Sequence, residues 1–369
     1  MKSKKIKVLL VISKISTDGI SKLLSEYICN YSEDIQVELM TYKIENDIYF
    51  KNLNIKIYEI GTSKNFIKRV FKEKKIMKDN NYDVIHINGN YCSRLFDCIA
   101  AKIAKIKKII IHSHNTNSGT DNKIKNMIHV ITKKLFDFFA TDYFACSDEA
   151  AKWMFSKKIW KNKKYYFIKN GIDINKFKYN EKSRIDLRNK YNLNNKFVIG
   201  HVGRFQYQKN HRFLIDVFYE IQKKNSNSIL LLIGTGEFEH EIRNKVEKLG
   251  ISNKVLFLGN KEDANKYYSA MDCFALPSFF EGLGIVAIES QTSGLPTYVY
   301  KSVPEAANIS KLFKKIDSLD AVIWSNEILN SEKNDRKNAY KAADIAGYSI
   351  ISVVQNLELL YKQNGVVRK

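Results

Sequence analysis

Short apolar runs recur along the chain, and most of them are followed by a segment with helical periodicity. Residues 6–12 form an almost unbroken apolar run, as expected of a parallel strand buried on both faces. Residues 20–31 follow as an amphipathic helix, and the same unit then repeats. The pattern predicts an α/β protein. Strands are predicted at 6–12, 37–42, 55–60, 84–87, 108–112, 142–146, 165–168, 197–203, 229–233, 255–258, 271–276 and, as the last, 298–300. Helices are predicted at 20–31, 64–78, 93–104, 123–139, 149–155, 211–223, 265–270, 285–292 and 348–361.

A change in composition divides this pattern. With 369 residues the chain is too long for one ordinary core, so two domains are expected. Residues 176–195 are polar and charged, and a new buried strand begins at 197. We therefore predict domains at 1–190 and 191–347.

The formal net charge of +22 lies mostly in the first half. Residues 1–190 hold 38 Lys and Arg against 20 Asp and Glu, whereas residues 191–369 hold 23 against 19. Nucleic acid, an anionic membrane surface or a lysine-rich composition would each explain this excess. The segment 123–139 is basic and aromatic. It could form an ordinary amphipathic helix face or a face that contacts a membrane surface.

Two further absences bear on location. The sequence contains no stretch of about 18 uncharged apolar residues, so neither a membrane-spanning helix nor a signal peptide is predicted. The five cysteines are odd in number and lack metal-ligand spacing, which indicates reduced thiols. We expect a cytoplasmic protein, with peripheral attachment to the inner face of the plasma membrane as an option.

The segment from 271 to 292 carries the strongest chemical signal. A buried strand, a glycine-containing loop at 277–284 and a helix N-terminus together present free N–H groups and a positive dipole end, which is an anion site. Glu281 and Glu289 bracket it, and eight helical residues rise about 12 Å. Phosphates between them and a sugar hydroxyl pair at each carboxylate would fit a nucleotide sugar. The alternative is a helix cap beside a solvated glutamate.

This segment resembles the family 4 retaining glycosyltransferases, whose signature reads P-S-x-x-E-G-x-G-x-x-x-x-E followed by G-x-P. The matching residues are Pro277, Ser278, Glu281, Gly282, Gly284, Glu289, Gly294 and Pro296. The resemblance implies the GT-B fold, with two Rossmann-like domains facing a central cleft. The first domain would bind the acceptor and be completed by the helix at about 348–361, and the second would bind the nucleotide sugar.

A second group of candidates follows the strand at 197–203. Arg204 directly follows Gly203, and Lys209 comes five residues later before a helix, so the two cations would suit a diphosphate. Surface cations are common, but this spacing resembles the family's G-R-x-x-x-x-K. The resemblance implies that both neutralise the departing nucleoside diphosphate and that Asn260 lies near the donor base. It also implies that Glu289 holds the ribose, while Glu281 and the loop from Gly282 through Leu283 to Gly284 face the sugar and phosphates.

The first half offers weaker candidates. His112 and His114 leave a parallel strand at its carboxyl end, where ligands collect, although an isolated pair of this kind is more often structural. The segment resembles the His-Ser-His-Asn of exopolysaccharide transferases, in which one histidine lies near the donor sugar and the acceptor. We favour His114 and keep His112 in reserve. Asp18 and Gly19, in the loop after the first strand, are further acceptor-side candidates.

Taken together, the resemblance predicts a retaining glycosyltransferase that moves a sugar from a UDP-sugar to a saccharide acceptor. The acceptor would be linked to a lipid diphosphate, and the product would be exopolysaccharide, capsule or O-antigen. The expected catalytic residues are His114, Arg204, Lys209 and Glu281, with no metal and no other cofactor. A sugar-nucleotide epimerase of the same fold is the alternative. A nucleic-acid binder would leave the second-half motifs unexplained, so no nucleic-acid partner is expected.

Overall fold

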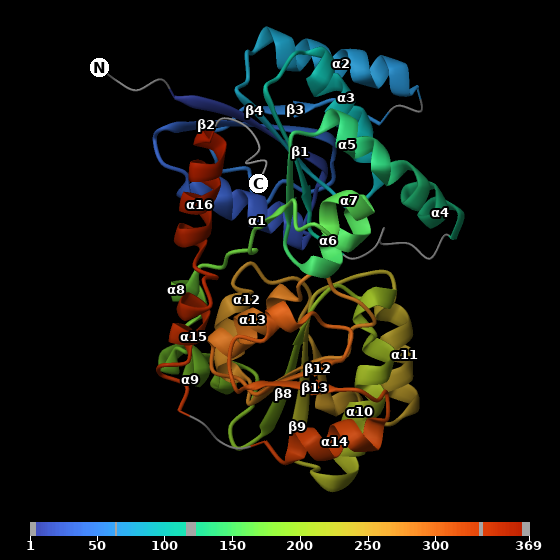
Figure 1. The fold of residues 1–369 in the computed structure, drawn as a ribbon. Helices are drawn as coiled ribbons and strands as arrows, with labels where there is room; N and C mark the ends of the chain where they lie inside the picture. The colour runs from blue at the N-terminus through green and yellow to red at the C-terminus, as the bar shows by residue number, and fades with distance from the viewer. Residues whose placement is uncertain (1–4, 63–64, 116–122, 332–334, 364–369) are drawn as a thin grey trace. The chain divides into compact units, whose positions relative to one another are not determined.

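The computed structural model describes residues 5–62, 65–115, 123–331 and 335–363. The chain forms two compact units (Figure 1). The first comprises Met1–Ile172 and Ser349–Lys369, and the second comprises Asp173–Tyr348. Among the described residues, no helix combines the length and the apolar character needed to cross a bilayer. The five cysteines form no disulfide.

Parallel strands form the sheet of the first unit, in the order β3-β2-β1-β4-β5-β6-β7. Its central strands are rich in Val, Ile and Leu and mostly buried on both faces, as parallel strands between helices must be. The strands are β1 (Ile6–Ile15), β2 (Ile35–Ile44), β3 (Ile57–Glu59), β4 (Val84–Asn88), β5 (Lys108–Ser113), β6 (Asp142–Ala145) and β7 (Tyr166–Phe167). The helices are α1 (Gly19–Asn30), α2 (Phe66–Asp79), η1 (Cys92–Arg94), α3 (Leu95–Ile103), α4 (Lys123–Thr132), η2 (Lys133–Leu135), α5 (Phe136–Phe139), α6 (Asp148–Met154), α7 (Lys157–Trp160) and α16 (Ile350–Lys362).

Helix α16 belongs to the first unit although it lies at the end of the chain (Figure 1). Its apolar face joins α1 and the strands in one core that contains Tyr27, Leu357 and Tyr361. Glu358 accepts hydrogen bonds from the backbone N–H and the hydroxyl of Ser32, at 2.6 and 2.8 Å. These contacts hold the C-terminal helix against one face of the sheet, and α2 and α3 lie on the other face.

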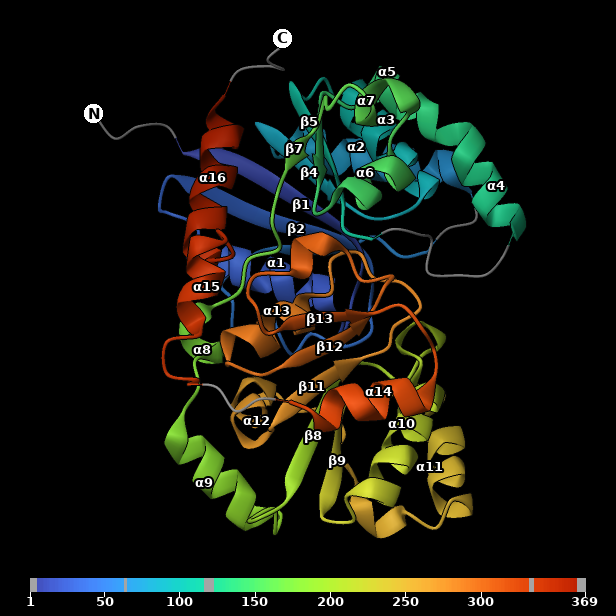
Figure 2. The same ribbon diagram turned by 60° about the horizontal axis from the view of Figure 1, so that its bottom comes forward.

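The second unit contains another parallel sheet, in the order β10-β9-β8-β11-β12-β13. Helices α10, α11 and α14 cover one face, whereas α12 and α13 lie on the other (Figure 2). The strands are β8 (Phe197–Val202), β9 (Ser228–Ile233), β10 (Val255–Phe257), β11 (Cys273–Leu276), β12 (Thr297–Tyr300) and β13 (Phe313–Ile316). The helical segments are α8 (Ile174–Phe177), α9 (Glu181–Lys190), η3 (Tyr207–Lys209), α10 (His211–Lys224), α11 (Glu239–Lys248), η4 (Ser252–Lys254), α12 (Ala264–Ala270), α13 (Ile285–Thr292), η5 (Glu305–Ala307), α14 (Ala321–Leu329) and α15 (Tyr340–Ile345).

The prediction that residues 298–300 form the last strand is wrong. β13 follows and pairs in parallel with β12 at the sheet edge. Lys314 and Lys315 interrupt its apolar pattern, and an edge strand tolerates such residues because only one side is paired. Helix α14 after it buries Trp324 completely in the core of the second unit.

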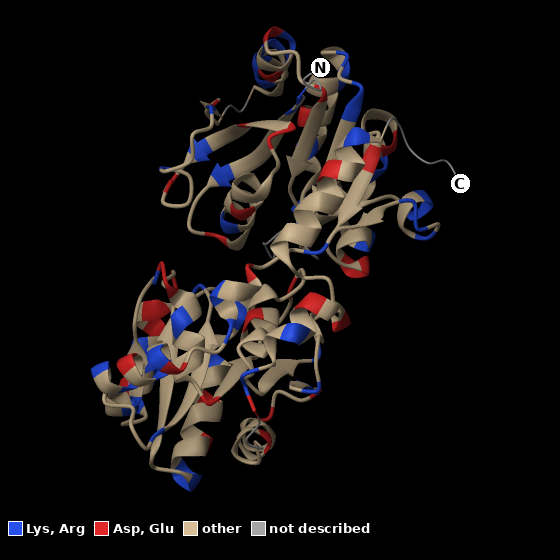
Figure 3. Ribbon diagram, turned by 90° about the vertical axis from the view of Figure 1, so that its left-hand side faces the viewer, with Lys and Arg blue, Asp and Glu red and all other residues tan. Residues whose placement is uncertain are grey.

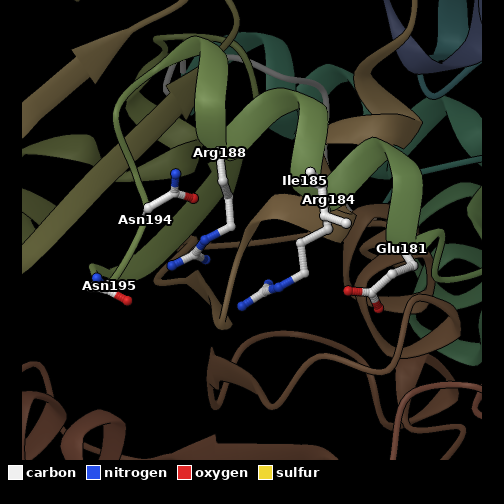
Figure 4. A pocket seen from close by; sticks show the side chains of 6 residues that line it. All are labelled: Glu181, Arg184, Ile185, Arg188, Asn194 and Asn195. Carbon is white, nitrogen blue, oxygen red and sulfur yellow. The ribbon is translucent and has the colours of Figure 1, made fainter.

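The units divide after Ile172, earlier than the boundary expected near residue 190. The polar run after Ile172 includes helix α9, whose arginines anchor it to the second unit. Arg184 binds the Asp272 carboxylate at 2.7 Å, and Arg188 binds the same carboxylate at 3.2 Å and the Ala270 carbonyl at 2.8 Å. Both arginines also line a surface pocket beside α9 (Figure 4). Charged residues in this run therefore attach the helix to one unit and do not form a linker.

Candidate functional site

The residues expected to bind the nucleotide sugar lie in loops that follow neighbouring strands of the second sheet. β8 pairs in parallel with β11, with Ile199 beside Cys273 and Gly200 beside Phe274. The carboxyl ends of parallel strands lie at one edge of a sheet, so the loops after β8 and β11 emerge side by side. Two motifs more than 70 residues apart in the sequence are thus brought to one place.

Backbone and side-chain contacts join these two loops. The Phe279 N–H donates to the Gln208 carbonyl at 2.8 Å, and the Gln208 side-chain amide donates to the Phe280 carbonyl at 3.0 Å. The rings of Tyr207 and Phe279 stack with their centroids 4.8 Å apart. The loops after β8 and β11 therefore form one structure.

Lys209 and Glu281 form an ion pair within that structure. Lys209 Nζ lies 2.6 Å from Glu281 Oε1, and the two side chains are 15% and 7% exposed. Gln208 donates to the other carboxylate oxygen, Oε2, at 3.1 Å. The residue expected to meet the diphosphate and the residue expected to meet the sugar therefore bind each other in this structure.

Glycine allows the lysine to reach this position. A Cβ placed on Gly203 would lie 3.3 Å from both Cδ and Cε of Lys209, so the lysine stem crosses directly over the backbone. Gly203 also contacts the next loop, because a Cβ on Gly234 would lie 2.1 Å from the Gly203 carbonyl oxygen. The turn after β8 is thus packed between Lys209 and the turn after β9.

Arg204 differs from Lys209 in having no partner. It is partly exposed, and within the described part of the chain its guanidinium makes no hydrogen bond or ion pair. An unpaired guanidinium next to this loop is the cation most available to an anionic ligand.

Helix α13 begins at these loops without a side-chain cap. Its N-cap is Gly284, in the left-handed conformation with φ +80°, and no side chain accepts from its first turn. Glycine suits this conformation, and a Cβ there would also lie 3.1 Å from Val303 Cγ1. Leu283 is 2% exposed, so it and Gly282 offer the site mainly backbone. The helix dipole and these amide groups favour an anion here.

Glu289 lies one turn further along α13, and a residue of helix α12 binds its side chain. It is 5% exposed, and its Oε2 accepts a hydrogen bond of 2.7 Å from the Tyr268 hydroxyl of α12. Burial, and then the Glu289 charge, raise the pKa of Tyr268 well above its usual value, so the hydroxyl stays a donor. Asn260 is exposed after β10 and bonds to none of the other expected donor residues in the described structure.

Several residues near these loops were not singled out from the sequence. His201 is fully buried on β8; its Nδ1 donates to the Ala275 carbonyl at 2.8 Å, and burial lowers its pKa to about 4. His211 stacks on Phe205 with centroids 4.1 Å apart. Ser278, which the sequence identified as part of the matching signature but gave no role, is also fully buried, and its hydroxyl has no partner among the described residues. A polar residue within the apolar run at 197–203 is the sequence signal that could have identified His201.

In the first unit, His114 is held by asparagines. Its Nε2 lies 2.8 Å from Asn88 Oδ1, while the Asn88 amide group donates to the carbonyls of Val11 and His86. Both ring nitrogens face amide oxygens that can only accept, and the contact with Asn88 is the shorter, so in the neutral ring Nε2 carries the proton and Nδ1 keeps its lone pair. Nδ1 lies 3.3 Å from Asn170 Oδ1, a contact that becomes a hydrogen bond when the ring is protonated, and burial lowers the His114 pKa to about 4.

His112 lies behind His114 and belongs to the interior. It is completely buried, with Nδ1 3.0 Å from His86 Nε2, and His86 Nδ1 is 2.6 Å from the Tyr361 hydroxyl. The rings of His112 and His114 are 3.8 Å apart. A chain of polar groups therefore runs from α16 to His114, and His114 is the more exposed histidine at 6%.

The loop after β1 has a local structural role. Asp18 is the N-cap of α1, where its carboxylate accepts from the Ser21 N–H at 2.8 Å and from the Ser16 hydroxyl at 2.8 Å. Gly19 is the first residue of that helix. Separately, no group of three His, Cys, Asp or Glu residues in the described ranges is arranged to hold a metal ion.

Comparison with known families identifies the second unit. The profile of the family described as Glycosyl transferases group 1 matches residues 183–343, which include every residue expected to bind the donor. Residues 183–343 therefore carry the sequence pattern of that family, and the chain is a glycosyltransferase.

Relatives in sequence are also glycosyltransferases, and a solved structure shows the fold. The transferase is 26% identical over 317 residues to EpsF, a protein of Bacillus subtilis (strain 168) that is classed as a glycosyltransferase, covering 83% of this chain and 82% of that one. It is 24% identical over 314 residues to the UDP-Gal:alpha-D-GlcNAc-diphosphoundecaprenol alpha-1,3-galactosyltransferase of Escherichia coli, covering 80% and 79%. The Anabaena protein Alr3699/HepE, solved with UDP and glucose, superposes with a TM-score of 0.81 at 20% identity, covering 97% and 100%. This likeness confirms the predicted GT-B fold.

Proposed function

We propose that this transferase moves a sugar from a UDP-sugar to a saccharide carried on a lipid diphosphate, with retention of the anomeric configuration. The product would be a cell-surface polysaccharide, namely exopolysaccharide, capsule or O-antigen, built on the cytoplasmic side of the membrane. The Anabaena structure contains UDP, and the Escherichia coli relative is named for a UDP-sugar and a diphosphoundecaprenol acceptor. The resemblance of the His-Ser-His-Asn segment to exopolysaccharide transferases supports the same pathway.

The observation that carries the proposal is the uncapped N-terminus of α13 beside the Lys209–Glu281 pair. When the bond from the anomeric carbon to the diphosphate breaks, the electron pair leaves with the phosphate oxygen. Arg204, Lys209 and the amides at Gly282–Gly284 would stabilise that charge, an effect worth several kcal/mol for each well-placed donor in a closed site. We propose that the diphosphate draws Lys209 away from Glu281, which frees the carboxylate for a sugar hydroxyl.

In this proposal the acceptor oxygen bonds to the anomeric carbon on the face that the diphosphate leaves, and its proton passes to the leaving phosphate oxygen. Glu289 accepts from the ribose hydroxyls while Tyr268 holds it in place. The first unit serves the acceptor, and His114 offers the Nδ1 lone pair to a hydroxyl group. Two protein cations carry out the charge neutralisation, so the proposal includes no metal ion.

The test is a transfer assay with the purified chain. UDP-, GDP- and ADP-sugars would be screened by thermal shift, and those that bind would be incubated with a short polyprenyl diphosphate saccharide. We expect UDP-sugars to raise the melting temperature most, transfer to persist in EDTA, and the product to keep the donor's anomeric configuration by NMR. Preference for another base, loss of activity in EDTA, or an inverted product would each overturn the corresponding part of the proposal.

A further inference from the structure

Helix α4 of the first unit exposes the side chains that a surface helix normally buries. A helix of a globular protein turns its apolar stripe to the core and its polar residues to water. In α4 only His129 is buried. Most apolar residues of α4 and of the segment after it stand in solvent. We call those on one face the α4 stripe, which leaves out the exposed Val130 (51%): Ile124 (68% exposed), Met127 (58%), Ile128 (44%), Ile131 (64%), Leu135 (40%) and Phe138 (72%).

The spacing places these residues on one side of the helix. Counted from Ile124, the later members follow at three, four, seven and eleven residues, which is the repeat of a single helical face. Phe138 extends the stripe through α5. Figures 1 and 2 show α4 at the outer edge of the first unit in both views. The stripe is thus a continuous apolar surface and not a scatter of single residues.

The opposite side of α4 is fixed to the first unit. The His129 ring packs against Tyr91 and Trp153, with centroids 5.5 and 4.4 Å away, and its Nε2 lies 3.0 Å from the Trp153 carbonyl. Lys133 Nζ donates to the Lys152 carbonyl at 2.8 Å. Because polar residues anchor the inner side, the helix cannot turn its apolar stripe inward without breaking these bonds.

Along most of the stripe the charged residues of the same segment are all lysines. From Lys123 to Leu135 the sequence contains four lysines and no Asp or Glu. The next acid, Asp137, is bound to the Ser156 hydroxyl at 2.7 Å. Lys123 and Lys134 are exposed beside the stripe. Lys and Arg occur on elements of both units (Figure 3), but the first 190 residues carry most of the excess. The partner that complements an apolar stripe with a lysine border is apolar and anionic.

We propose that the α4 stripe is the surface by which the first unit docks on an anionic lipid bilayer. Its apolar side chains enter the boundary between headgroups and acyl chains, and the lysines meet lipid phosphates. A second copy of the chain fits less well, because a two-fold contact would place Lys123 and Lys134 against a surface with the same charges. The inference does not depend on which donor or acceptor the enzyme uses.

Flotation of the full chain with lipid vesicles tests the proposal. Vesicles of phosphatidylcholine alone would be compared with vesicles that also contain phosphatidylglycerol, using the unaltered chain and the double variant Ile124→Glu/Ile131→Glu. The control is Ile185→Glu/Ile351→Glu, which alters two isoleucines 51% and 54% exposed on α9 and α16. All four positions are exposed, so the variants should fold, and melting curves check this.

We expect the unaltered chain and the control to bind the anionic vesicles, and the stripe variant to bind them about tenfold more weakly or worse. Lys123→Ala/Lys134→Ala should reduce binding and its dependence on salt. Transfer to a water-soluble acceptor should be the same in all variants. Equal binding by the stripe variant and the control would overturn the proposal. So would a dimer in light scattering that becomes monomeric in the stripe variant, because a second copy would then cover the stripe.

Discussion

Lys209 Nζ lies 2.6 Å from Glu281 Oε1, so the cation expected for the diphosphate is neutralised by the carboxylate expected for the sugar. Gln208 holds the other carboxylate oxygen, and Glu281 therefore keeps a partner if Lys209 moves. A ligand phosphate that takes Lys209 would change the charge on both sides of the pair at once. Donor binding and the orientation of Glu281 are coupled by this contact.

The first prediction concerns this pair. Lys209→Ala should lower kcat by about 100-fold or more, since it removes a donor to the leaving group. It should also lower the free energy of unfolding by about 2 kcal/mol, because it leaves the mostly buried Glu281 without its counter-ion. Lys209→Ala/Glu281→Gln should regain most of the stability and none of the activity. Denaturant titration and transfer kinetics on the same samples separate the two effects. If the changes in unfolding free energy caused by Lys209→Ala and by Glu281→Gln simply add up in the double variant, the two residues are not coupled.

Replacing Arg204 should reduce activity with little effect on stability, whereas replacing Lys209 should reduce both. Its guanidinium has no partner in the described part of the chain, so Arg204→Ala should change the free energy of unfolding by less than about 0.5 kcal/mol. Transfer should still fall by about 100-fold, and UDP affinity should fall with it. Arg212→Ala is the matched control, because Arg212 is 62% exposed and pairs with Glu241 on the surface. A normal rate in Arg204→Ala would remove this residue from the proposed site.

The negative charge of Glu289 should matter for donor binding more than the shape of its side chain does. Glu289→Gln keeps an oxygen that can accept from Tyr268, so the fold should be retained while the KM for the donor rises about tenfold, because a charged acceptor to the ribose is lost. Tyr268→Phe should cost about 1 kcal/mol of stability and raise the same KM less. A KM left unchanged in Glu289→Gln, with kcat reduced instead, would contradict its assignment to the nucleoside.

The sequence predicted most elements because their signals are local. Helix α13 was predicted at 285–292 and is found at Ile285–Thr292, since Gly284 before it and Gly294 after it mark both ends. The edge strand β13 was missed because Lys314 and Lys315 hide its apolar pattern. The unit boundary was placed too late because the charged run at 176–195 resembles a linker until Arg184 and Arg188 are seen to bind Asp272.

The contacts within the site were harder to foresee than its members. The motifs identified the loops after β8 and β11, but only the order of strands in the sheet makes these loops neighbours. Spacing along the chain says nothing about a side chain's partner, so the pairing of Lys209 with Glu281 had no sequence signal. The same is true of Asn88, which lies 26 residues from the histidine it binds.

Asn88 provides a prediction for the first unit. Asn88→Asp would replace a neutral acceptor at His114 Nε2 with a charged one, which favours the protonated imidazole and raises the pKa of His114 from about 4. If His114 works through a neutral Nδ1, the acid limb of the pH–rate profile should move to higher pH, whereas kcat at pH 8 should change little. Asn170→Asp is the companion variant at Nδ1. An unchanged profile in Asn88→Asp would show that the His114 tautomer has no role in transfer.

Buried histidines should make the second unit sensitive to acid. Burial lowers the pKa of His201 to about 4 and that of His211 well below its usual value, so both stay neutral in the folded state. Above pH 6.5 neither state takes up a proton, and the groups do not affect stability. Between pH 6.5 and 4 only the unfolded chain becomes protonated, so the free energy of unfolding falls as the pH falls.

His211→Phe should reduce this sensitivity. Neither ring nitrogen of His211 has a partner in the described structure, and a phenyl ring can keep the stacking on Phe205. Between pH 7 and pH 5 the loss of unfolding free energy should be smaller in the variant by up to about 2 kcal/mol, the cost of protonating one histidine only in the unfolded chain. Denaturant titrations at the two pH values measure this difference, with His240→Gln as the control at an exposed position. The same loss in His211→Phe as in the unaltered chain would mean that the folded protein takes up the proton at this site.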